Sequence, residues 1–145
     1  MAGFLGEAIL ASTIRRWAST ECDPYPCGQE VWRYACELAG APMPPLPAHG
    51  SRRAMRALLR EHGGLEAYSR ELILSLGWRE VAEPGRGDVG VVRIKGMGLT
   101  CAISLGSMWM AKGPHHVLIV RAPHRAAWSL ECLKQSLPSL SLPSR

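Results

Sequence analysis

The period of the hydrophobic pattern changes near Gly77, and this change constrains the fold more than any other feature of the sequence. Before this glycine, apolar residues recur at helical spacing over residues 4–17, 28–39, 52–62 and 65–76. After it, short apolar runs alternate with glycine and proline turns, as in 89–94 and 99–105. Helices followed by neighbouring strands predict an α+β fold, with the N-terminal helices packed on a small antiparallel sheet.

Glycine and proline set the expected boundaries of these elements. Gly40 is placed to end the second helix as a left-handed C-cap, and the proline-dense segment 41–47 predicts an extended connector. Gly106 leads into residues 107–111, and a further strand is expected over 116–121. Pro123 is expected to open a last helical turn that runs through Trp128.

The length of 145 residues fits one domain, which we expect over residues 1–132. Residues 133–145 repeat serine, leucine and proline without a core pattern, so they are expected to form a flexible C-terminal tail. With 47% hydrophobic and 20% charged residues, the composition excludes a mainly disordered chain.

The net charge is +5, from 17 lysines and arginines against 12 acidic residues. The basic residues are scattered and only nine residues are aromatic, so we interpret the charge as a solvated basic face first and a polyanion site second. Nucleic acid is therefore not expected as the main partner. Four tryptophans, Trp32, Trp78, Trp109 and Trp128, are expected as core or partner-facing anchors.

The N-terminus lacks the order of charges that a signal peptide requires. Glu7 interrupts the apolar run, and Arg15 and Arg16 follow the run instead of preceding it. No apolar stretch approaches the roughly 20 residues of a spanning helix. Synthesis in the cytoplasm and no membrane span are expected.

The five cysteines have an odd count and irregular spacing, which favours free thiols over a disulfide framework. Cys22 and Cys27 could form a metal clip with His115 and His116, but adjacent residues on a strand point to opposite faces. We therefore expect no metal. Glycine pairs at 85–87 and 96–98 lack the strand–helix context of a phosphate loop, so no nucleotide or other cofactor is expected.

Cys27 is the candidate nucleophile. It follows Pro26 at or just before the first turn of an expected helix, where backbone N–H groups and the helix dipole stabilise a thiolate. The alternative is a cysteine that only packs at a helix start. Cys22 is a second candidate, but the Asp23-Pro24 pair that follows prevents a helix from starting there. Asp88, before a strand, is expected to cap its turn.

Three segments resemble NlpC-type cell-wall cysteine peptidases. Residues 27–40 resemble the helix that carries the nucleophile, 87–92 the family's Gly-Asp strand, and 102–106 the following strand with its glycine turn. The order of parts over roughly residues 17–130 is similar to small phage-encoded relatives of these enzymes, including the Arg-rich helix with its Gly63-Gly64 end and a terminal tryptophan such as Trp128.

This resemblance implies a papain-like fold in which the Cys27 thiolate attacks a peptide bond of the peptidoglycan stem through an acyl-enzyme, with an imidazole as base. The sequence departs from the family at two positions. Pro26 stands where an aspartate precedes the nucleophile, and Thr100 stands where the histidine is usual. His115 or His116 would then have to supply the imidazole. His49 and His62 are expected at the surface.

The resemblance also implies a phage tail-tip protein, made in the host cytoplasm and carried in the virion tail. Tail hub or tail-tip proteins and peptidoglycan are then the expected partners. Activity as a cysteine peptidase stays an open question because of Thr100. The alternative is a non-enzymatic structural component that plugs or bridges the tail hub, and a basic adaptor that contacts nucleic acid is a weaker third option.

Overall fold

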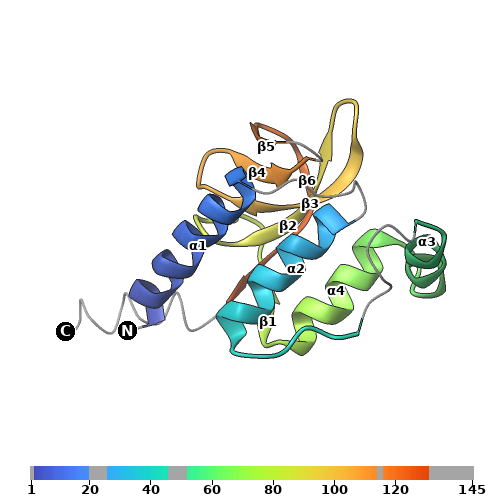
Figure 1. Cartoon of the computed structure of the whole chain (residues 1–145), viewed down its shortest axis with the longest axis horizontal. Coiled ribbons are helices and arrows are strands. Elements are labelled where there is room, and N and C mark those ends of the chain that lie inside the picture. Colours follow the sequence, from blue (N-terminus) through green and yellow to red (C-terminus); the bar gives the residue numbers. More distant parts are fainter. Residues whose placement is uncertain (1, 20–25, 46–51, 114–115, 131–145) are drawn as a thin grey trace.

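Four helices and six strands form the part of the chain that the computed structural model describes, which comprises residues 2–19, 26–45, 52–113 and 116–130. The helices are α1 (Ala2–Ser19), α2 (Pro26–Ala39), α3 (Arg52–Glu61) and α4 (Leu65–Ser75). The strands are β1 (Trp78–Glu80), β2 (Val89–Ile94), β3 (Gly98–Ser104), β4 (Trp109–Lys112), β5 (Val117–Val120) and β6 (His124–Leu130). The predicted α+β class is confirmed (Figure 1).

The six strands form one antiparallel sheet in the order β1-β6-β2-β3-β4-β5. β2 and β3 form the central hairpin, in which Val91 lies opposite Cys101. The hairpin turn needs Gly96 and Gly98, whose φ angles of 87° and 79° lie in the left-handed region that favours glycine. The predicted hairpin, with its loop at 96–98, is therefore confirmed.

The chain after Pro123 is a strand, and the predicted helical turn through Trp128 is wrong. β6 pairs with β1 on one side and with β2 on the other, so that Trp128 lies opposite both Glu80 and Val89. Residues 126–130 are all buried, because Ala126, Trp128 and Leu130 lie in the core under the helices and Ala127 lies in a smaller core on the opposite face. A run of consecutive buried residues has no alternation that would distinguish a strand from a helix.

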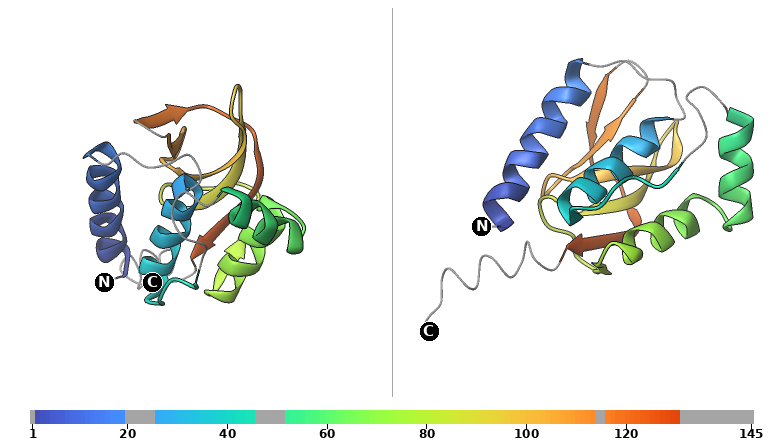
Figure 2. Two further views of the ribbon diagram at one scale, coloured as in Figure 1. Left: turned by 45° about the vertical axis from the view of Figure 1, so that its right-hand side comes forward. Right: turned by 60° about the horizontal axis from the view of Figure 1, so that its bottom comes forward.

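Three helices cover one face of the sheet. α2 contacts β3 and β4, α4 contacts β1, β2 and β6, and α1 packs beside α2. Figure 2 shows α2 between α1 and α4 in its left-hand view. The core between these layers includes the buried side chains Leu10, Trp17, Trp32, Tyr34, Ile73, Trp78, Val91, Cys101, Ile103, Met110 and Trp128. All four tryptophans named from the sequence are at most 6% exposed, so the core interpretation of these residues is confirmed.

The opposite face of the sheet has a smaller core around Trp109, with Val92, Ile94, Ala102, Ala111 and Ala127. The Trp109 ring reaches from β4 to Gly90 on β2. A Cβ atom added at Gly90 would lie 2.8 Å from the ring atom Cη2 of Trp109 and 2.7 Å from the carbonyl oxygen of Ala126. Gly90 is therefore required by this close approach.

Candidate functional site

Cys27 lies in the first turn of α2, as the sequence predicts. α2 begins at Pro26, and proline is favoured there because its missing N–H needs no partner and its φ angle suits a helix. The backbone of Cys27 is therefore at the positive end of a helix of 14 residues. Its side chain lies outside the described part of the structure, as does the whole of Cys22.

The other end of α2 has the glycine cap that the sequence predicts. Gly40 has a φ angle of 70°, and its N–H donates to the carbonyl oxygen of Glu37 at 3.1 Å. The N–H of Ala41 donates to the carbonyl oxygen of Cys36 at 2.9 Å. These two bonds are a Schellman motif, which satisfies the last carbonyls and fixes where α2 ends.

A buried chain of hydrogen bonds joins α2 to α4 and the sheet. The indole N–H of Trp32 donates to Ser69 Oγ at 3.1 Å, and Ser69 Oγ is hydrogen-bonded to Cys101 Sγ at 3.4 Å. Burial raises the pKa of the Cys101 thiol from 9.0 to about 11, against the opposing effect of its hydrogen bonds to Ser69 and Trp32. Burial also raises the pKa of Cys36. Both thiols are thus held protonated near neutral pH and act as structural groups.

A second contact joins α2 to the turn before β2. Tyr34 Oη donates to the carbonyl oxygen of Gly87 at 2.7 Å. Burial raises the pKa of Tyr34, and the nearby charge of Asp88 raises it further, so this phenol stays a donor. Asp88 Oδ2 accepts the N–H of Gly85 at 2.7 Å, which confirms that Asp88 caps this turn. Sequence analysis missed the role of Tyr34, since its partner lies 53 residues away.

Thr100, where the resemblance expects the histidine, lies half-buried in β3 opposite Val92. A threonine hydroxyl does not accept a proton near neutral pH. β3 is nevertheless one of the strands that contact α2, and Figure 1 shows the beginning of α2 beside this strand. The helix and strand that would carry a catalytic pair are therefore adjacent, but β3 supplies no imidazole there.

Among the described residues, two histidines have a hydrogen-bonded ring. His62 Nδ1 lies 3.1 Å from Glu71 Oε1, and its ring packs edge-on against Tyr68. His124 Nε2 lies 3.1 Å from the carbonyl oxygen of Ala82. Neither ring contacts Cys36 or Cys101, the two thiols that the structure describes.

The two histidines proposed as the base lie in or next to the connection between β4 and β5. His116 is exposed, and its carbonyl oxygen accepts the N–H of Gly113 at 2.8 Å. His115 and His49 lie outside the described residues. The structure therefore places His116 on the turn after β4, and its pairing with Cys27 stays a prediction because the Cys27 side chain lies outside the described residues.

Lys112, at the end of β4, is a buried cation that sequence analysis did not single out. It is 2% exposed, and its ammonium donates to the carbonyl oxygen of Gly113 at 2.9 Å. In the described part of the chain it has no carboxylate partner. A buried lysine is rare unless it is paired. A single lysine in a run of apolar residues gives no sequence signal that separates it from a surface residue.

The described residues contain no cluster of three or more histidine, cysteine or acidic side chains that would bind a metal ion. None of their helices is both long enough and apolar enough to cross a membrane. Searches against family models, curated proteins and solved structures found no match to this chain.

Proposed function

We propose that the chain is a papain-like, NlpC-type domain of a phage tail tip, derived from a peptidoglycan cysteine peptidase, whose cysteine–histidine pair is incomplete. Its role is then that of a structural component of the virion tail. Support for the fold comes from a helix that carries Cys27 in its first turn and packs on an antiparallel sheet, with the Gly87-Asp88 turn leading into β2.

The observation that carries the proposal is the half-buried Thr100 in β3. Nucleophilic catalysis by a cysteine needs an imidazole within hydrogen-bond reach, to form the thiolate and to protonate the leaving amine. Thr100 supplies neither function. The rings of His62 and His124 are engaged by Glu71 and Ala82.

Digestion of purified peptidoglycan tests the enzymatic part of this proposal. We expect the wild-type protein to release no more soluble stem peptide than Cys27→Ser, because the nucleophile lacks its base. Thr100→His is the matched gain-of-function variant, since it places an imidazole at the position of the family's histidine. Cleavage by the wild type that is lost in Cys27→Ser would contradict the incomplete pair.

Cleavage of peptidoglycan is the second candidate function, and the position of His116 after β4 favours it. β4 contacts α2, and His116 is exposed on the turn that follows β4. An imidazole from His115 or His116 would then act as the base for Cys27. Under this alternative, His115→Ala or His116→Ala abolishes peptidoglycan cleavage as fully as Cys27→Ser does.

The tail-tip assignment has its own test. Particles purified from the phage or prophage that encodes the chain are separated into capsids and tails, and each fraction is analysed by peptide mass spectrometry. We expect peptides of this chain in a constant ratio to the tail proteins. Their presence only in the soluble fraction of the lysate would contradict a place in the virion.

A further inference from the structure

α3 presents a stripe of three exposed arginines away from the core. Met55 on this helix is 3% exposed and packs into the core, with Leu58 and Leu59 partly buried beside it. Arg53, Arg56 and Arg60 occupy the exposed positions. Their spacing of three and four residues places the three guanidinium groups in one row along the helix.

Several arginines elsewhere in the described structure are paired with glutamates. Arg16 lies 3.4 Å from Glu30 and 3.8 Å from Glu37, and Arg70 lies 3.4 Å from Glu66 and 3.3 Å from Glu80. These pairs show how the fold neutralises its own basic side chains.

Two arginines of the α3 stripe, Arg53 and Arg60, differ from these pairs. Among the described residues, no carboxylate lies within 4.0 Å of the Arg53 or Arg60 guanidinium. Like charges at this spacing repel and destabilise an isolated helix. An external anion would relieve this repulsion.

The stripe also borders a hollow in the surface. A cavity of about 400 Å³ is lined by Arg53, Arg56, Ala57 and Arg60. The small Ala57 side chain leaves space between the longer arginines. Guanidinium groups around a recess are placed to receive carboxylates in the bidentate geometry that arginine favours. Figure 1 shows α3 at the edge of the molecule beyond α4, the helix it contacts, so that a partner has access to it.

The size of the stripe and the charge around it favour a compact acidic ligand. Arg53 and Arg60 are seven residues apart, which is about 10 Å along a helix. The exposed glutamates Glu61 and Glu71 lie on α3 and the adjacent α4. A long polyanion such as duplex nucleic acid would extend past the stripe and meet these carboxylates. A short segment with three or four acidic side chains would not.

We infer that the α3 stripe of Arg53, Arg56 and Arg60 binds an acidic helical segment of a partner protein, whose carboxylates recur at the same helical spacing. This inference does not depend on the chemistry of Cys27 or on the proposed tail-tip role.

Fluorescence anisotropy with a labelled helical peptide tests it, using glutamates at positions i, i+3 and i+7, and a second peptide with glutamines there. At about 150 mM salt, we expect the full chain to bind the glutamate peptide and not the glutamine peptide. The double variant Arg53→Gln/Arg60→Gln should bind about tenfold more weakly. Because both side chains are exposed, its thermal unfolding should match the wild type.

The matched control is Arg93→Gln/Arg121→Gln, which removes two exposed arginines from the sheet region and changes the net charge equally. We expect it to retain the wild-type affinity. Equal weakening in both double variants, or no binding of the glutamate peptide, would overturn the inference. Tighter binding of a DNA oligonucleotide than of the peptide, lost in Arg53→Gln/Arg60→Gln, would overturn it in favour of a nucleic-acid partner.

Discussion

α2 and α3 are both amphipathic helices, but they differ in what satisfies their polar groups. Along α2, Trp32 and Tyr34 donate hydrogen bonds to other elements, and Glu30 is paired with Arg16. On α3, the exposed Arg53 and Arg60 have no carboxylate partner among the described residues. Contacts within the fold therefore explain these side chains of α2, whereas Arg53 and Arg60 on α3 are left for a partner to neutralise.

Truncating Trp32 should have the largest effect on stability. Trp32→Ala removes a side chain that is 1% exposed and also leaves the Ser69 hydroxyl without its indole donor. We expect the free energy of unfolding to fall by about 3–5 kcal/mol. Urea denaturation measures it, with Arg53→Gln/Arg60→Gln as the variant that should change little. A loss of similar size in both proteins would remove the distinction between α2 and α3.

Alkaline pH should destabilise the α2 region through Cys101. The folded thiol has a pKa of about 11 instead of 9.0, so above pH 9 the unfolded state ionises first. The stabilising contribution is complete below this pH and is lost as the pH rises towards 11, at about 1.4 kcal/mol per pH unit. Urea titrations across this window should show the slope. Cys101→Ala should remove the part of this pH dependence that comes from the thiol. The same slope in Cys101→Ala as in the wild type would contradict the burial of the thiol.

Ser69→Ala should have a smaller effect, because it deletes one hydroxyl between Trp32 and Cys101. The indole N–H then becomes a buried donor without a partner, and we expect a loss of about 1–3 kcal/mol. Ser75→Ala is the matched control, since the Ser75 hydroxyl is exposed and donates only to Leu72 within α4. Equal losses in the two variants would show that the buried Ser69 hydroxyl contributes no more to stability than the exposed Ser75 hydroxyl does.

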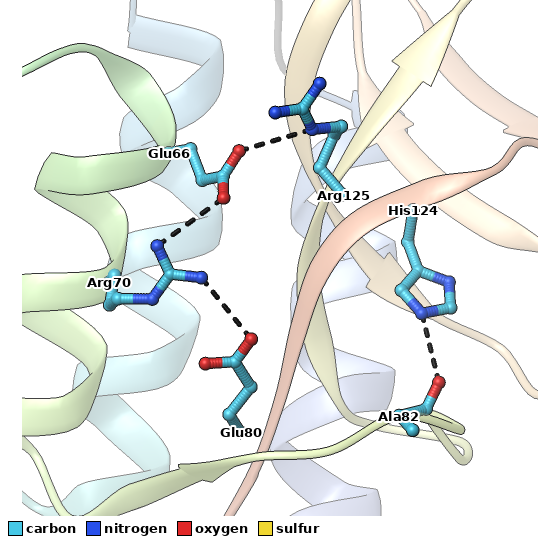
Figure 3. A network of polar contacts seen from close by, with 6 residues as sticks. All are labelled: Glu66, Arg70, Glu80, Ala82, His124 and Arg125. Carbon is cyan, nitrogen blue, oxygen red and sulfur yellow. Dashed lines mark hydrogen bonds and ion pairs between the residues drawn. The ribbon is translucent and has the colours of Figure 1, made fainter.

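The smallest effects should distinguish paired from unpaired surface charges. Glu66 lies 3.4 Å from both Arg70 and Arg125, in the network that Figure 3 shows. Glu66→Gln should therefore lower the free energy of unfolding by about 0.5–1 kcal/mol. Arg60→Gln should leave it unchanged or raise it by a few tenths, because it relieves repulsion. A larger loss in Arg60→Gln would mean that α3 is neutralised within the chain.

Much of the fold could be predicted from the sequence, because the spacing of apolar residues and the glycines at the ends of helices and strands are local signals. They placed all four helices and the hairpin of β2 and β3 within a few residues of the structure. β1 was missed, since three residues are too few to show an alternation. β6 was mistaken for a helical turn because burial on both faces removes the alternation of a strand.

The site was less accessible to sequence analysis, because its contacts join distant residues. The bond of Trp32 to Ser69 spans 37 positions, and that of Ser69 to Cys101 spans 32. No local pattern encodes such pairs. The position of Cys27 at the start of a helix is a local property and was predicted. An Arg-rich helix that ends at Gly63-Gly64 was also expected, but the hollow beside its arginines became visible only in the structure.

The pH profile of iodoacetamide labelling at Cys27, read by peptide mass spectrometry, tests the incomplete cysteine–histidine pair most directly. Cys27→Ser assigns the signal, and the buried Cys101 serves as an internal unreactive thiol. Our account predicts the same Cys27 profile in the wild type, His115→Ala and His116→Ala, because no imidazole is paired with the thiol. A profile that moves to higher pH in either histidine variant would show that the pair exists and would contradict the account.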